Sequence, residues 1–105
     1  MSADPLWEAF VEAVLSHGAA VEASSRFADK PALFVAEREI AHYDGDGVVD
    51  VRVTAEGWDD LPEEVRGDPT VRRQRRRDWA EVHLTEPAEL DRLGPLIAAA
   101  VEHNR

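Results

Sequence analysis

The sequence has no cysteine, which excludes disulfides, thiolate metal sites and cysteine nucleophiles. It also has no uninterrupted apolar stretch long enough to span a bilayer, and residues 1–5 carry neither the basic nor the apolar region of a secretion signal. Internal repeats and low-complexity tracts are missing as well. We therefore expect a cytoplasmic protein that does not bind membranes.

What the sequence does contain is enough for one globular domain. Its 105 residues are 44% hydrophobic, which suffices for one modest core and argues against disorder. We expect a single domain over residues 1–105. The formal net charge of −10 disfavours nucleic acid and anionic membranes as partners of the molecule as a whole. The exception is a basic segment between Arg72 and Arg77, called here the arginine run.

An amphipathic helix is predicted at residues 5–17. Asp4 can accept from the free amides at the helix start, and Gly18 suits the position just past its end. Pro5 fits the first helical position, where no amide donor is needed. Apolar residues recur at the spacing of one helix face, namely Leu6, Trp7, Phe10, Val11, Val14 and Leu15.

The following segment changes to a period of two, which is typical of an antiparallel meander. The turn Asp44-Gly45-Asp46-Gly47 is rich in residues that tolerate positive φ, so it predicts a tight hairpin between the last two strands. The four predicted strands span residues 20–25, 32–35, 38–43 and 48–53.

The register of this hairpin decides which side chains share a face. With an even-numbered loop, His42 lies opposite Val49 and points to the buried face. The same register turns Asp50 to the other face. It also pairs Glu39 with Arg52 and collects Ile40, Val49, Val51 and Val53 in the core.

The remaining elements complete an α+β fold. A short helix is predicted at residues 59–66, after a loop that contains Trp58, and a final strand at residues 79–85. A C-terminal helix starts at residues 85–87, and Gly94-Pro95 should kink it or divide it in two. We expect an antiparallel sheet of about five strands in the order α-β-β-β-β-α-β-α.

Several segments carry a resemblance to a known family. Residues 27–43, and especially 38–42 (REIAH), are followed by 46–50 (DGVVD) and later by Asp78-Trp79. In these segments the sequence resembles a family of small uncharacterised bacterial domains known as the luciferase domain. The resemblance implies an antiparallel sheet with helices on one face, similar to MmcQ/YjbR-like domains, and no established reaction. The sequence departs from the family pattern at Ala36-Glu37, where glycines are expected, and before Trp79, where histidines are expected.

His42 and the loop residues Asp44 and Asp46 are candidates for acid–base catalysis. A carboxylate holds a nearby histidine in one tautomer and keeps it poised near neutral pH. Because the predicted register turns Asp50 away, only the loop aspartates can reach His42. The alternative interpretation is a core histidine with satisfied hydrogen bonds.

Metal sites are weakly indicated. Residues 44–47 with Asp50 resemble a calcium loop, but the EF-hand spacing and a closing glutamate are missing. His17, His83 and His103 complete the histidines, and no two have the spacing of a helical zinc site. We therefore expect no metal and no cofactor.

The arginine run is a candidate site for phosphate groups, with Trp58 and Trp79 nearby to stack on the bases of a single strand. The alternative interpretation is a solvated loop or edge strand, whose charge blocks unwanted strand pairing. The basic residues concerned are Arg72, Arg73, Arg75, Arg76 and Arg77.

These observations favour a non-catalytic binding module, present as a monomer or weak homodimer. Its partner is expected to be a protein or an anionic ligand, which contacts the arginine run and Trp79 or the sheet face assigned to Tyr43 and Asp50. Two alternatives stay open: a small hydrolytic or isomerising enzyme centred on His42, and a protein that binds single-stranded nucleic acid through the arginine run.

Overall fold

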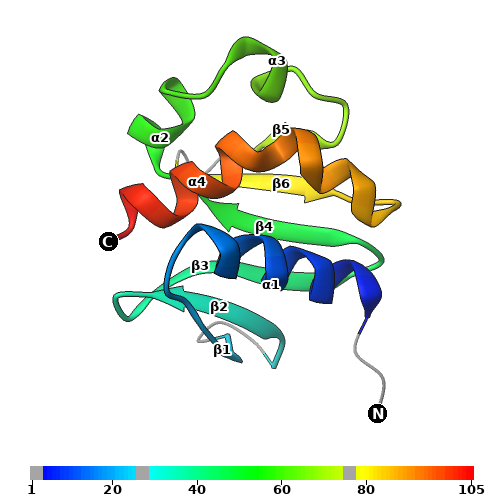
Figure 1. Ribbon diagram of the computed structural model, residues 1–105, viewed down its shortest axis with the longest axis vertical. Helices are drawn as coiled ribbons and strands as arrows, with labels where there is room; N and C mark the ends of the chain where they lie inside the picture. The colour runs from blue at the N-terminus through cyan, green and yellow to red at the C-terminus, as the bar shows by residue number, and fades with distance from the viewer. Residues whose placement is uncertain (1–3, 26–28, 75–77) are drawn as a thin grey trace.

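A computed structural model describes residues 4–25, 29–74 and 78–105. The fold is α+β, with an open antiparallel sheet of six strands in the order β1-β2-β3-β4-β6-β5. Helices α1, η1 and α4 lie across one face of the sheet (Figure 1), and none of the described residues forms a helix over the opposite face. The elements are α1 (Pro5–His17), β1 (Val21–Ser24), β2 (Pro31–Val35), β3 (Arg38–Gly45), β4 (Val48–Arg52), α2 (Ala55–Asp59), α3 (Glu63–Arg66), β5 (Val71–Arg73), β6 (Trp79–His83), η1 (Pro87–Leu93) and α4 (Gly94–His103).

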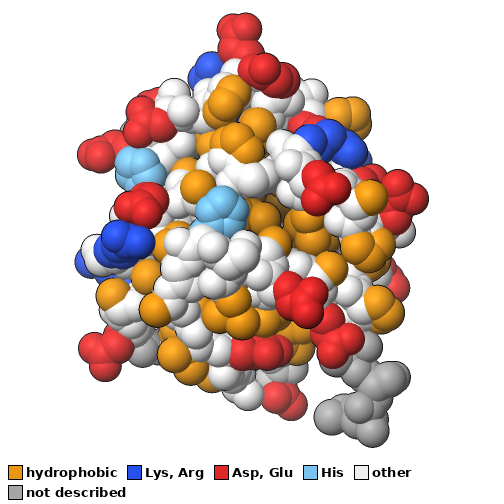
Figure 2. All heavy atoms as spheres, in the orientation of Figure 1, with side chains coloured by type: hydrophobic (Ala, Val, Ile, Leu, Met, Phe, Trp, Pro, Cys, Tyr) orange, Lys and Arg blue, Asp and Glu red, His pale blue; other side chains and the backbone are white. Residues whose placement is uncertain are grey.

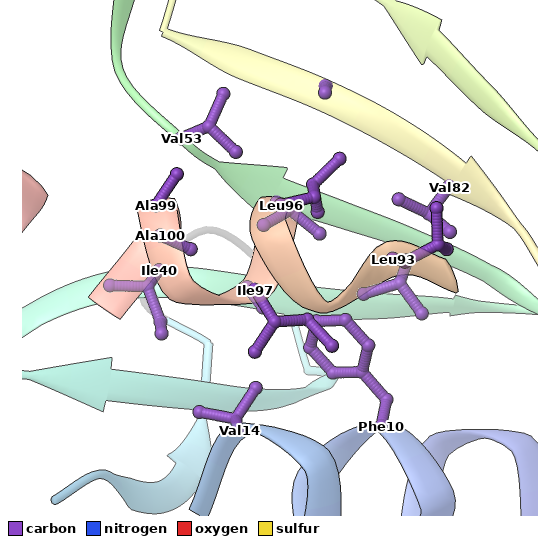
Figure 3. Packing of buried hydrophobic residues seen from close by; sticks show 14 of the residues in the cluster. Phe10, Val14, Ile40, Val53, Val82, Leu93, Leu96, Ile97, Ala99 and Ala100 are labelled. Atoms are coloured by element: carbon purple, nitrogen blue, oxygen red, sulfur yellow. The ribbon is translucent and has the colours of Figure 1, made fainter. Parts of the chain in front are cut away.

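The hydrophobic core lies between the sheet and these helices. Phe10 and Val14 of α1 point toward Ile97 of α4 (Figure 3), and Trp7 stacks on Phe10 and on Tyr43 of β3. Each large side chain buried in this way stabilises the fold by roughly 1.5–3 kcal/mol. The exposed surface over the helices carries scattered acidic side chains (Figure 2), in agreement with the net charge.

Most predicted elements are confirmed at their expected positions. Helix α1 begins with Asp4 accepting from the amide of Leu6 at 2.9 Å and with proline at its first position. The tight turn between β3 and β4 has positive φ at Gly45, Asp46 and Gly47. Gly47 is also required for packing, because a Cβ there would lie 2.0 Å from the carbonyl oxygen of Leu84.

The connection between β4 and β6 differs from the prediction. Trp58 lies in the short helix α2 and not in a loop, because Thr54 caps that helix by accepting from the amide of Gly57 at 3.0 Å. Of the helix predicted at residues 59–66, only the second half is a helix of its own, α3 (Glu63–Arg66). The start of the arginine run forms β5, a sixth strand at the edge of the sheet.

The C-terminal segment is divided at Gly94 as the proline predicts. The 3₁₀-helix η1 precedes this position and α4 follows it. Glu86 and Glu89 form a capping box at the start of η1. Within the described ranges, none of the helices combines the length and the apolar character needed to cross a membrane.

Strand β3 contains two β-bulges, and each inserts one residue that has no partner in the neighbouring strand. In the pairing with β2 the extra residue is Ile40, and in the pairing with β4 it is Asp44. Because of the second bulge, His42 pairs with Asp50. The predicted register, in which His42 faces Val49, is therefore wrong by one residue.

The two bulges decide which face each side chain of β3 takes. Val49 and Val51 of β4 are buried in the core, so Asp50 between them points to the opposite face. Its cross-strand partner His42 shares that face, and the prediction that His42 points to the core is wrong. Ile40 nevertheless lies in the core, beside Ala99 and Ala100 of α4 (Figure 3), as predicted. Since the first bulge breaks the alternation of the strand, residues 40 and 42 take opposite faces.

Glu39 and Arg52, which the predicted register pairs, make separate contacts. Glu39 lies opposite Phe34 of β2. Arg52 donates to a carboxylate oxygen of Asp78 at 3.3 Å and also to the side-chain oxygen of Asn104. Arg52 therefore connects β4 to the segment before β6 and to the C-terminus. The carboxylate of Glu39 contacts His42 instead.

Candidate functional site

The face of the sheet without helices carries a cluster of ionisable side chains centred on His42. Its Nδ1 lies 2.9 Å from Oε2 of Glu39, and its Nε2 lies 2.7 Å from Oδ2 of Asp50. An oxygen of Asp44 lies 3.7 Å from the same Nε2. These four residues are called the His42 cluster. Both ring nitrogens therefore face carboxylates.

The bulges of β3 bring these residues together. Residues three apart on a regular strand point to opposite faces, but the extra residue Ile40 places Glu39 and His42 on the same face. The second bulge turns Asp44 toward that face at the end of the strand. Asp50 arrives from β4 as the direct cross-strand partner of His42.

Three polar side chains from other elements hold the carboxylates in place. Ser25, after β1, donates to Oε2 of Glu39 at 3.0 Å. Lys30, just before β2, donates to Asp44 at 2.5 Å. Gln74, just after β5, donates to Asp50 at 2.5 Å. The cluster thus draws on strands from both ends of the sheet.

The members of the cluster differ in burial. The side chain of Glu39 is only 4% exposed, whereas those of His42, Asp50 and Asp44 are 15%, 14% and 25% exposed. Glu39 therefore contacts the imidazole from the buried side of the cluster. Asp44 and Asp50 lie on the solvent side of the cluster, where a ligand can reach them.

The surroundings favour the protonated form of His42. The hydrogen bond to Asp50 raises the pKa of His42, partial burial opposes this, and the hydrogen bond to Glu39 raises the pKa further. For Asp44, burial raises the pKa, but the hydrogen bond from Lys30 and the nearby positive charge outweigh it and leave the pKa below the ordinary value. The carboxylates of Asp50 and Glu39 therefore both favour the charged form of the ring.

The same arrangement contains possible metal ligands. Nε2 of His42 and one carboxylate oxygen each of Asp44 and Asp50 lie within 4.8 Å of one another. The sequence analysis expected no metal site, because it relied on regular ligand spacing within a helix or loop. Here the ligands come together across a bulged hairpin, and a hairpin of this kind has no characteristic spacing of ligands in the sequence.

The other candidates on this hairpin lie outside the cluster. Asp46 is exposed in the turn. Tyr43 is buried on the helix side, where its hydroxyl donates to Asp4 at 2.5 Å and accepts from the amide of Gly47 at 2.8 Å. The expected binding surface with Tyr43 and Asp50 on one face is therefore wrong, since the register shift separates them.

Both tryptophans near the arginine run are almost fully buried. Trp79 packs against the imidazole of His42, with ring centroids 5.5 Å apart. Trp58 is covered by Arg73, whose guanidinium carbon lies 5.2 Å from the ring centroid. Neither ring presents the open surface that stacking on a base requires.

The arginine run is only partly described. Arg72 and Arg73 are exposed residues of the edge strand β5, and Arg72 lies opposite Glu81 of β6. Arg75, Arg76 and Arg77 lie outside the described residues. The run therefore begins as the edge strand that one interpretation predicted.

A separate apolar hollow lies beside β1 at the other edge of the sheet. Its volume is about 510 Å³, and its lining includes Ala20, Val21 and Phe34. All four residues of β1 are exposed, and Val21 is one of two large hydrophobic residues that are exposed within the described part of the chain. This hollow shares no residue with the His42 cluster.

Sequence reasoning found His42, Asp44 and Asp50 but missed the residues that support them. Glu39 was assigned to Arg52, and Lys30, Ser25 and Gln74 had no signal, because each reaches the cluster from a different strand end. Comparisons of the chain with known protein families, with curated proteins and with solved structures found no match. The resemblance to the luciferase-domain family therefore stays a prediction.

Proposed function

We propose that the protein is a non-catalytic binding module, that the His42 cluster is its binding site and that the ligand is a cation. The observation that carries this proposal is the placement of both His42 ring nitrogens against carboxylates, at 2.9 Å from Glu39 and 2.7 Å from Asp50.

Binding is favoured over catalysis by the contacts of the imidazole. A general base needs a ring nitrogen that can accept a proton from a substrate. In the His42 cluster, each ring nitrogen is directed at an internal carboxylate. His42 therefore serves to organise the carboxylates around it.

A cationic ligand is favoured by the balance of charge. Among the residues that the structure describes, the three carboxylates of Glu39, Asp44 and Asp50 face one imidazole, that of His42, and one ammonium group, that of Lys30. The more exposed members are the two aspartates, so an approaching anion would meet negative charge first. The sequence predicts a protein or an anionic ligand as the partner, and we propose a cation in its place for the face with Asp50.

The enzyme alternative keeps one supporting observation, which is the contact of 2.7 Å between Nε2 of His42 and Asp50. Such a pair also positions a proton for transfer. The two functions differ in what a ligand does to the pair. A cation is expected to compete with the Nε2 proton, whereas a substrate of an acid–base enzyme must be consumed.

A thermal-shift screen of the full chain tests the proposal, because a ligand that binds only the folded state raises the melting temperature. The panel contains divalent metal salts, organic ammonium and guanidinium compounds, nucleotides and short oligonucleotides. A cation at about 100 times its Kd should stabilise the fold by roughly 2.7 kcal/mol. At about 4–8 °C per kcal/mol, the shift is easily measured.

The matched control is His83→Gln. His83 also contacts a carboxylate, that of Glu81 at 2.5 Å, but lies outside the His42 cluster. The shift should persist in this variant and disappear in Asp50→Asn. A shift produced only by nucleotides or oligonucleotides would contradict the proposal, as would turnover of a substrate that depends on His42.

A further inference from the structure

We propose that the cation bound by the His42 cluster is a divalent transition-metal ion. Its ligands are Nε2 of His42 and one carboxylate oxygen each of Asp44 and Asp50, and Glu39 positions the imidazole. This inference rests on the function proposed above and specifies the chemical class of the ligand.

The distances between the ligand atoms fit a metal ion after small side-chain movements. Ligands at 2.0–2.2 Å from a tetrahedral metal lie about 3.3 Å from one another. Nε2 of His42 is 2.7 Å from the nearest oxygen of Asp50 and 3.7 Å from that of Asp44. A bound metal therefore requires the two partly exposed carboxylates to rotate until both distances approach this value.

Glu39 determines which nitrogen of His42 faces the metal. A metal-binding histidine commonly donates its other N–H to a carboxylate, which fixes the tautomer and the ring orientation. The buried carboxylate of Glu39 occupies this position at Nδ1, and the hydroxyl of Ser25 holds it there. Metal binding then replaces one proton, the one on Nε2, and Asp50 changes from acceptor to ligand.

The donor set selects the class of metal. Calcium and magnesium prefer sites made of oxygen ligands, whereas an imidazole nitrogen suits zinc, iron, cobalt, nickel and copper. One nitrogen and two carboxylate oxygens therefore favour a transition metal. Three protein ligands also leave a coordination position for water, in contrast to closed structural zinc sites with four protein ligands.

Lys30 acts as an internal competitor of the metal. Its ammonium group lies 2.5 Å from Oδ1 of Asp44, the oxygen that is 3.7 Å from Nε2 of His42. The metal must displace this ion pair. Because the Lys30 side chain is considerably exposed, it can move into solvent. Removal of its charge should therefore increase metal affinity, because the metal no longer has to displace the Lys30 ammonium group from Asp44.

Isothermal titration calorimetry on the full chain, freed of metal by a chelator, is the experiment. Zinc and cobalt chloride are the probes, and magnesium and calcium chloride the comparison. His42→Gln should lower zinc affinity at least as much as loss of an orienting residue does, which is about 10–100-fold. The matched control His83→Gln removes a histidine with the same kind of carboxylate contact and should leave affinity unchanged.

Two further variants separate metal binding from folding. Glu39→Gln should lower zinc affinity by about 10–100-fold and alter the visible absorption of bound cobalt, which a purely structural role would not change. Lys30→Met keeps every ligand and should raise zinc affinity. Its result stands even if His42→Gln fails to fold.

The outcomes also separate this inference from the proposed function. Equal zinc affinity in His42→Gln and His83→Gln, or unchanged affinity in Lys30→Met, would overturn the metal site. If organic cations raise the melting temperature through Asp50 and divalent metals do not, the metal inference fails and the cation-binding module stands. If no cation binds, both fail.

Discussion

Glu39 differs from the other two carboxylates of the His42 cluster in its surroundings. It is buried and receives hydrogen bonds from Ser25 and His42, whereas Asp44 and Asp50 are more open to solvent. Because a buried charge must be compensated, removal of His42 alone leaves Glu39 in an unfavourable position. The conservative replacement Glu39→Gln is therefore the better variant for separating positioning from folding.

A second buried carboxylate, Asp68, gives a prediction for pH dependence. It accepts from Arg92 at 2.6 Å and from both the amide and the hydroxyl of Thr70. The hydrogen bond from Arg92 is the main cause that lowers the pKa of Asp68 from 3.8 to about 2. Since the folded state holds the ionised form, this contribution to stability is complete above pH 4 and is lost as the pH falls toward 2.

The contribution of Asp68 is about 1–2 kcal/mol after allowance for the exposure of Arg92. Urea unfolding of the protein and of Asp68→Asn should differ by this amount at pH 6. The difference should shrink steadily between pH 4 and pH 2. A difference that stays constant over this range would show that the ionised form is not what Asp68 contributes.

Among the elements, helix α1 and strands β1 to β4 are predictable from sequence, because their periodicities and turn residues are local signals. The register of β3 is not, because a bulge depends on how neighbouring strands fit together. Nothing in the sequence identifies Ile40 and Asp44 as the extra residues of the bulges. The register shift that they cause places His42 on the face without helices and not in the core. The candidate residues were therefore found, and their arrangement was not.

The turn between β3 and β4 gives a prediction at this scale. Gly47→Ala places a side chain at φ 81° and within 2.0 Å of the Leu84 carbonyl oxygen, so it combines backbone strain with overlap. The expected loss of stability is about 2–4 kcal/mol. The matched control is Gly45→Ala, which has φ 91° but no atom within 4 Å of the new Cβ.

Urea unfolding should therefore place Gly45→Ala between the native protein and Gly47→Ala, with a loss of about 1–2 kcal/mol from the backbone alone. Equal losses in the two variants would mean that the close approach to Leu84 does not constrain the turn. Because this turn sets the position of Asp44, Gly47→Ala should also weaken cation binding.

The whole molecule combines an acidic surface with one basic edge. The net charge of −10 opposes the approach of nucleic acid, and the buried rings of Trp58 and Trp79 offer no surface for base stacking. We therefore predict no specific binding of short single-stranded DNA at physiological salt, as measured by fluorescence anisotropy. Tight binding with a steep salt dependence, lost in Arg72→Ala/Arg73→Ala, would contradict this.

The most direct test of the account follows the four histidine side chains by ¹⁵N nuclear magnetic resonance while zinc chloride, or an organic cation, is added to the full chain. The ring nitrogens of His42 should shift, and those of His17, His83 and His103 should stay constant, because only His42 belongs to the cluster of converging carboxylates. Unchanged His42 signals in the presence of every cation would contradict the proposal that this open sheet face is the binding site.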